Sequence, residues 1–192
     1  MRQLVIKISR ALFGWPPAPA SFLEKKNLIS QVAQENKLTC FVENGTFRGE
    51  MIAAQHEHFQ KLFSIELSRE LFEACRARFA GDEKIQLCQG DSGVKLGEVA
   101  AQVVEPALFW LDAHYSYGNT AGGDSAAPII KELSCLALRK QANDAILIDD
   151  ARLFGLKSGY PKLEVIRKYA SQYWPRHQFA IQSDIICILP SR

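Results

Sequence analysis

The sequence predicts an α/β protein with a doubly wound, mostly parallel seven-stranded sheet that ends in an antiparallel hairpin. From Thr39 onward, short β-rich apolar runs alternate with helical stretches. The runs are apolar at nearly every position, which is typical of parallel strands buried on both faces. Only the three residues 182–184 join the last two runs, too few for a parallel crossover, so these two strands must form a hairpin.

The chain is long enough to bury one sizeable core, and its charge does not indicate a nucleic-acid partner. The chain has 192 residues, of which 47% are hydrophobic and 23% charged. Its formal net charge of +2 is too near balance for a nucleic-acid footprint, so we expect no nucleic-acid partner. The five cysteines are widely spaced without a C-x-x-C pair. They indicate buried thiols in a reducing compartment, and we expect a cytoplasmic protein.

The N-terminal segment differs from the rest of the chain. Residues 1–13 place apolar side chains on one helical face and Lys7 and Arg10 opposite, a weakly basic amphipathic pattern. Such a helix either covers the protein's own surface or contacts a membrane surface; no apolar run is long enough to span a membrane. A Pro-rich linker follows at 15–19. We therefore expect a helical segment with this linker at 1–38 and a second domain at 39–192.

The helices and strands are predicted one by one from spacing. Ser21 with Glu24 forms a capping box, and the helix that follows repeats apolar residues at 28, 29, 32 and 33. Two later helices carry apolar residues at 67, 71, 75 and 79 and at 129, 133 and 136, and Pro161 starts a third. The predicted strands are 40–42, 62–65, 85–88, 107–111, 145–148, 178–181 and 185–189.

The chemistry should lie beyond the carboxyl ends of the strands, where ligands bind in open parallel sheets. The first strand leads into a loop with glycines at Gly45 and Gly49, which lets the backbone turn tightly beside a ligand. By itself this is as typical of a plain strand-to-helix turn as of a cofactor site. Glu66, which ends the next strand, favours the cofactor site because a carboxylate there can accept both ribose hydroxyls.

These segments resemble those of class I S-adenosylmethionine-dependent methyltransferases, over roughly residues 39–192. The resemblance is carried by V-E-N-G-T-F-R-G at 42–49, S-I-E-L-S at 64–68 and G-D-S at 90–92. It implies a Rossmann-like fold and S-adenosylmethionine as cofactor. The implied cofactor-binding residues are Glu43, the loop residues Gly45, Thr46 and Gly49, Glu66, Asp91 and Ser92. The Gly45–Gly49 loop would pass the methionine portion, Glu66 would bind the ribose, and Asp91 and Ser92 would lie near the adenine.

Three carboxylates end two neighbouring central strands: Asp112 after the fourth, Asp149 and Asp150 after the fifth. Converging negative charge is unfavourable unless a cation offsets it, and a hard divalent cation such as Mg²⁺ prefers such oxygen ligands. The alternative is that these aspartates cap turns and helices. The arrangement resembles the metal-dependent O-methyltransferases of the catechol and macrocin types, as does L-D-A-H-Y-S at 111–116, which contains His114.

The predicted function is methyl transfer from S-adenosylmethionine to a hydroxyl of a small molecule or sugar, assisted by Mg²⁺ or another divalent cation. Asp112 and His114 are the candidate catalytic residues, with His114 either the general base or a packed histidine. Segment 115–127 either covers the site or is a plain loop. Arg152 and Tyr160 could contact the acceptor, although Arg152 could equally pair with a carboxylate. The alternatives are a catalytically silent nucleotide-binding or metal-binding domain and a metal-independent methyltransferase.

Overall fold

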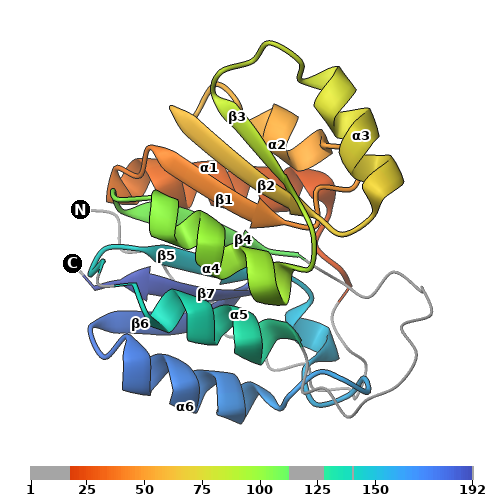
Figure 1. The fold of residues 1–192 in the computed structure, drawn as a ribbon. Coiled ribbons are helices and arrows are strands. Elements are labelled where there is room, and N and C mark those ends of the chain that lie inside the picture. The colour runs from red at the N-terminus through yellow and green to blue at the C-terminus, as the bar shows by residue number, and fades with distance from the viewer. Residues whose placement is uncertain (1–17, 113–127, 140, 192) are drawn as a thin grey trace.

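The protein is built around one seven-stranded sheet (Figure 1). The computed structural model describes residues 18–112, 128–139 and 141–191. The strand order is β3-β2-β1-β4-β5-β7-β6. The strands are β1 (Cys40–Asn44), β2 (Lys61–Glu66), β3 (Ile85–Gln89), β4 (Ala107–Leu111), β5 (Ala145–Ile148), β6 (His177–Gln182) and β7 (Ile185–Pro190).

The sheet confirms the predicted fold class, including its hairpin. Strands β1 to β5 pair in parallel, whereas β7 is antiparallel to both β5 and β6. The β6–β7 turn consists of Ser183 and Asp184, whose φ angles are 47° and 62°. Two consecutive residues with positive φ match the right-handed twist of a tight hairpin.

Helices cover both faces of the sheet (Figure 1). On one face lie α1 (Phe22–Asn36), α2 (Glu50–Gln55) and α3 (Arg69–Arg78). On the other lie α4 (Ser92–Gln102), α5 (Pro128–Ala137) and α6 (Leu163–Tyr173), and a short 3₁₀ helix, η1 (Ala151–Leu153), follows β5. Leu67 is 63% exposed and precedes α3, so the prediction that it lines this helix is wrong.

Helix α1 packs into the same core as the sheet. Its buried residues Leu28, Ile29 and Val32 lie in one apolar cluster with Phe41 of β1 and Trp110 of β4. The predicted capping box is present: the Ser21 N–H donates to a Glu24 carboxylate oxygen at 2.8 Å, and the Glu24 N–H donates to Ser21 Oγ at 3.3 Å. The capping box therefore fixes Ser21 as the N-cap of α1.

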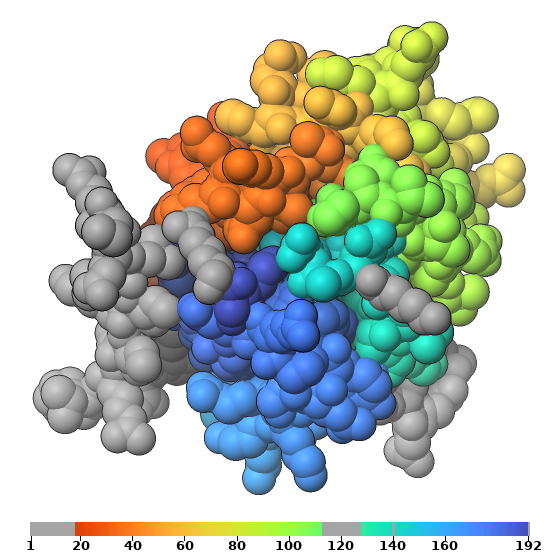
Figure 2. Space-filling model, turned by 90° about the vertical axis from the view of Figure 1, so that its left-hand side faces the viewer, coloured from red at the N-terminus to blue at the C-terminus, as the bar shows by residue number. Residues whose placement is uncertain are grey.

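The direction of α1 decides which residues reach the functional edge. The helix ends shortly before β1 begins, so the two run antiparallel and the first turn of α1 lies at the carboxyl edge of the sheet. Figure 2 shows the opposite edge, where segments coloured orange, green and blue lie side by side.

Some predictions fall outside the described residues. They include the amphipathic segment 1–13 and residues 15–17 of the Pro-rich linker. Among the helices that the structure describes, none combines the length and apolar composition that crossing a membrane requires.

Candidate functional site

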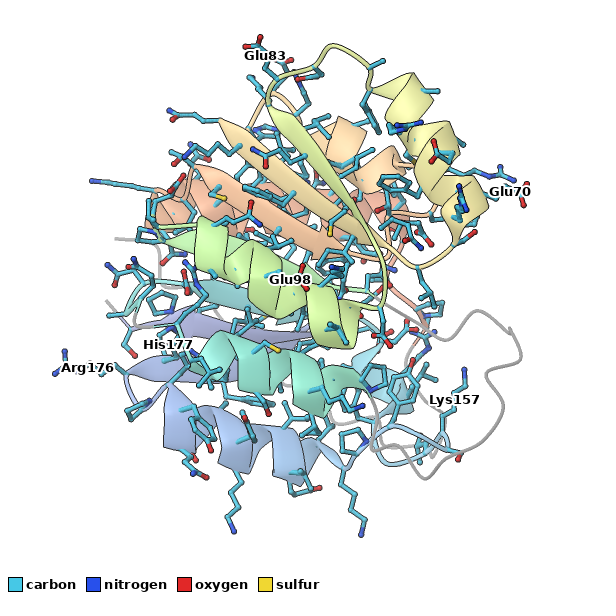
Figure 3. All side chains as sticks on the ribbon, viewed as in Figure 1. Glu70, Glu83, Glu98, Lys157, Arg176 and His177 are labelled. Atoms are coloured by element: carbon cyan, nitrogen blue, oxygen red, sulfur yellow. The ribbon has the colours of Figure 1, made fainter. Side chains whose placement is uncertain are left out.

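The sheet order reverses between β1 and β4, so the connections from these two strands leave in opposite directions. This is the point at which open α/β sheets bind ligands. The Asn44 side chain joins the two strand ends, because its Oδ1 accepts the Asp112 N–H at 2.7 Å. In Figure 3, Glu70 and Lys157 mark this carboxyl edge, whereas Arg176 and His177 mark the amino edge. The predicted site residues that the structure describes all lie at the carboxyl edge.

The loop after β1 depends on residues in the left-handed region. Gly45, Phe47 and Gly49 have φ angles of 82°, 50° and 72°. A Cβ added at Gly49 would lie 2.6 Å from the ring of Phe79, so this position excludes side chains for steric as well as conformational reasons. The loop therefore lies close against α3 and has one well-defined course.

Glu66 fixes this loop. One carboxylate oxygen accepts the Phe47 N–H at 2.8 Å, and the other accepts the Ser68 N–H at 2.8 Å. The carboxyl group is mostly buried, since Glu66 is 7% exposed. Each carboxylate oxygen has a second acceptor position, so Glu66 can hold the loop and still accept ribose hydroxyls.

Glu43 and Thr46 are buried and support the loop through Ser64. The Ser64 hydroxyl donates to Glu43 at 2.7 Å and lies 2.5 Å from the Thr46 hydroxyl. Burial raises the pKa of Glu43 to about 8, although the hydrogen bond from Ser64 opposes this. Direct contact of either residue with a cofactor stays a prediction.

Asp91 and Ser92 open helix α4. Asp91 is the N-cap and its carboxylate accepts the Gly93 N–H at 2.8 Å. The Ser92 hydroxyl donates to Glu132 at 2.5 Å, and the Asn44 amide donates to the same carboxylate oxygen at 2.7 Å. Contact of Asp91 and Ser92 with adenine stays a prediction.

Glu132 is a site residue that the sequence reasoning missed. It is 3% exposed and connects α5 to the ends of β1 and α4. A signal was present, because Glu132 falls on the helix face defined by Ile129, Leu133 and Leu136. A carboxylate at such a position has to find buried donors.

The strand-end aspartates lie on different faces. Successive strand residues point to opposite sides of a sheet. Trp110 and Leu147 pack on the side of α1, and Asp112 and Asp149, which directly follow β4 and β5, lie on the same side, because both contact Lys25 of α1. Asp150 follows Asp149 directly and is turned from it, in the left-handed conformation with φ 55°.

Lys25 of α1 supplies positive charge to the first two aspartates. Its Nζ forms an ion pair with Asp149 Oδ2 and lies 3.9 Å from Asp112 Oδ2 and 5.9 Å from the centre of the Trp110 ring. Burial alone would lower the pKa of Lys25, but the charges of Asp112 and Asp149 outweigh it and raise the pKa. Lys25 is therefore a persistent cation.

Lys25 was also missed from the sequence. It precedes Leu28, Ile29 and Val32 by three, four and seven residues, the spacing of one helix face. The buried face of α1 thus ends in a lysine at the carboxyl edge of the sheet. Its partners could not be identified without the position of α1 on the sheet.

Asp150 belongs to a separate ion-pair group. Arg152 Nη1 lies 2.5 Å from Asp150 Oδ1 and also pairs with the buried Asp184 in the β6–β7 turn. The Arg152 N–H donates to the same Asp184 at 2.7 Å. Of the two roles predicted for Arg152, the structure shows pairing with carboxylates. Tyr160 packs edge-on against Phe154, with ring centres 5.3 Å apart.

The predicted three-aspartate metal site is not assembled in this arrangement. No group of three or more His, Cys, Asp or Glu side chains within the described ranges could hold a metal ion. The physical reasons are that Asp150, in the left-handed conformation, pairs with Arg152, whereas the ammonium of Lys25 lies beside Asp112 and Asp149. The described residues therefore do not fit a divalent ion held by all three aspartates.

Two further predictions cannot be placed. His114 and segment 115–127 lie outside the described residues.

All five cysteines are free. Three of them are buried, Cys40, Cys75 and Cys187, and two are half-buried, Cys88 and Cys135. A shallow hollow lined by His56 and residues 78–84 lies at the amino edge before β3, away from the site residues named above.

Comparison with solved structures identifies the fold. The chain is similar to PaMTH1, a methyltransferase of Podospora anserina bound to S-adenosylhomocysteine (SAH): 18% identity, 90% of this chain and 80% of that chain covered, TM-score 0.59. It is similar to the O-methyltransferase TomG of Streptomyces achromogenes in complex with S-adenosylmethionine, with 15% identity, 92% and 83% coverage and a TM-score of 0.63. It also resembles an O-methyltransferase of Bacillus cereus in complex with SAH, with 14% identity, 91% and 84% coverage and a TM-score of 0.59.

No family model and no curated protein sequence matches the chain. The similar solved structures show that the chain shares the fold of these methyltransferases, and its chemistry has to be argued from its own site residues.

Proposed function

We propose that this protein transfers a methyl group from S-adenosylmethionine to a hydroxyl oxygen of a small molecule or sugar. The observation that carries the proposal is Glu66 at the end of β2, whose two oxygens fix the glycine-containing loop at the point where the sheet order reverses. The class I methyltransferase fold supports it, as do similar structures that hold this cofactor or its product.

Three groups of residues bind the three portions of the cofactor: the methionine, the ribose and the adenine. The backbone of Gly45–Gly49 passes the methionine portion, because glycine lets the chain approach a ligand closely. Glu66 accepts the two ribose hydroxyls through the acceptor positions that the backbone N–H groups leave open. Asp91 and Ser92 border the adenine, since β3 lies next to β2.

The reaction needs alignment and the removal of one proton. The acceptor oxygen attacks the methyl carbon, the carbon–sulfur bond breaks, and the sulfur keeps the electron pair, so the cofactor leaves as SAH. The acceptor hydroxyl loses its proton to a base. Asp112 is a candidate for that base because its side chain is 26% exposed at the switch point, and His114 remains the other candidate.

The role of a metal is a separate question from methyl transfer. Magnesium assistance stays a prediction of the sequence. The ammonium of Lys25 between Asp112 and Asp149 favours the metal-independent alternative. A catalytically silent nucleotide-binding domain with the same fold would bind the cofactor without transferring its methyl group.

Calorimetric titration with SAH tests the proposal. Wild type should bind SAH, and Glu66→Ala should bind it more weakly by about 1–3 kcal/mol, the effect of losing a buried hydrogen-bond acceptor. Glu70→Ala is the matched control, because this glutamate lies on α3 near the same edge and its side chain is exposed (Figure 3). Failure of wild type to bind SAH would refute the cofactor assignment.

Turnover separates an enzyme from a silent domain. S-adenosylmethionine with a labelled methyl group should transfer its label to at least one member of a panel of catechols, phenols and sugars. Binding of SAH without any transfer to the panel would favour the silent alternative.

A further inference from the structure

We infer that Lys25 is the resident cation of this site and positions Asp112 and Asp149 without a divalent metal ion. The inference rests on the proposed function, since it concerns how the same site handles its acidic residues. It makes α1, which lies before the first strand, part of the functional site. Lys25 is a positioning residue, because it acts on the acceptor through the carboxylates that it holds.

The ion-pair geometry is asymmetric. Asp149 is fully buried and its carboxylate pairs directly with the Lys25 ammonium. Asp112 lies farther from the ammonium, at 3.9 Å, and its side chain is 26% exposed. The buried aspartate therefore fixes the lysine, and the partly exposed one lies farther from it, at the surface of the site.

A resident ammonium and a divalent ion would compete for the same oxygens. Both are attracted to Asp112 and Asp149, and a metal ion held by them would lie within a few ångströms of the Lys25 charge, where like charges repel strongly. Displacing the lysine would leave a long cationic side chain at a half-buried position without its carboxylate partners. Leu28 and Ile29, one turn along α1, are buried and hold the helix against the sheet.

The surroundings of Lys25 stabilise it as a cation. Its Nζ lies 5.9 Å from the centre of the Trp110 ring, within range of a cation–π attraction. Asp150 adds negative charge at longer range while it pairs with Arg152. The ammonium thus belongs to a group of side chains from α1, β4 and the end of β5.

Manganese binding, measured by calorimetry and electron paramagnetic resonance with Mn²⁺ alone, tests the inference without requiring activity. Wild type should show no saturable site that depends on Asp149. Lys25→Met removes the ammonium and leaves the two carboxylates uncompensated, so it should gain a saturable Mn²⁺ site, at least roughly tenfold tighter than any residual Mn²⁺ binding of wild type. The extra binding should disappear in the Lys25→Met, Asp149→Asn double variant.

Two variants control this experiment. Lys26→Met makes the same substitution about 100° around the same helix and should leave Mn²⁺ binding unchanged. Lys25→Arg keeps the positive charge and should behave like wild type. If Lys25→Met does not fold, the comparison of wild type with Asp149→Asn still decides the test. A saturable Mn²⁺ site in wild type that is lost in Asp149→Asn would overturn the inference.

The methyl-transfer assay gives a second readout. Label transfer by wild type should be unchanged after exhaustive chelation with EDTA, and loss of transfer that Mg²⁺ restores would overturn the inference. SAH calorimetry on the same samples separates the two proposals. Binding of SAH together with metal-dependent transfer would contradict only the role of Lys25, whereas no binding of SAH would contradict the proposed function itself.

Discussion

Gly49→Ala should damage the loop after β1 far more than an equivalent change elsewhere. The φ angle of Gly49 is +72°, and the new methyl group would lie 2.6 Å from Phe79 Cε2, 2.9 Å from Phe79 Cζ and 3.3 Å from Cys75 Sγ. The first two contacts are shorter than real Cβ atoms show. The ring of Phe79 or the loop must therefore move.

The matched control is Gly81→Ala. Gly81 has nearly the same conformation, φ +84°, but a Cβ there would meet nothing within 4 Å. Both variants pay the conformational cost of a left-handed alanine, about 1–2 kcal/mol. Only Gly49→Ala adds the cost of overpacking, typically about 1–3 kcal/mol. We expect total losses of roughly 2–5 kcal/mol for Gly49→Ala and about 1–2 kcal/mol for Gly81→Ala.

Two assays measure this difference. Urea denaturation gives the free energy of unfolding of each variant, and SAH calorimetry gives the affinity. Gly81→Ala should keep the affinity of wild type, because Gly81 lies at the amino edge. Gly49→Ala should lose roughly tenfold or more. Equal stability losses for the two variants would contradict the close packing of Gly49 against Phe79. An unchanged SAH affinity in a folded Gly49→Ala protein would contradict the role of the loop in cofactor binding.

Two further predictions concern buried charge. The carboxyl of Glu43 has its pKa raised to about 8 from an ordinary 4.5, so between these values the folded state holds a proton that the unfolded state has released. The free energy of unfolding should therefore fall as pH rises through this window, and Glu43→Gln should flatten that dependence in urea titrations at several pH values; an identical slope in both proteins would contradict the assignment. Asp149→Asn should cost about 3–5 kcal/mol because it leaves the Lys25 ammonium without its main partner. The Lys25→Met, Asp149→Asn double variant should lose less than the sum of the single losses, and strict additivity in denaturation would argue against the pairing.

The overall fold followed from patterns that are local in the sequence. The apolar runs located all seven strands, and the three-residue connection at 182–184 required a hairpin. The capping box at Ser21 and Glu24 located the start of α1. These features depend on neighbouring residues, so the sequence alone contains them.

The contacts within the site were harder to predict, because they depend on how elements far apart in the sequence pack together. Asp112, Asp149 and Asp150 were correctly placed at strand ends. The separation of Asp150 from the other two depends on its left-handed backbone, which no sequence pattern indicated, and on its ion pair with Arg152. The pairing of Asp112 and Asp149 with Lys25 could not be predicted either, because it requires the position of α1 against β4 and β5.

Glu66 illustrates a partial success. Its place at the end of β2 was predicted, and its predicted role as acceptor of the ribose hydroxyls stays a prediction. Its hydrogen bonds with the N–H groups of Phe47 and Ser68 were not, because they depend on the positive φ of Phe47, a conformation that non-glycine residues seldom adopt.

Mapping SAH binding by amide chemical shifts in labelled wild-type protein tests the central claim most directly. The account predicts that the largest shifts on titration fall in residues 45–49, 66–68 and 90–92, with little change around His56 and residues 78–84 at the amino edge. Shifts that concentrate at the amino edge, or none at saturating SAH, would contradict the assignment of the carboxyl edge as the cofactor site.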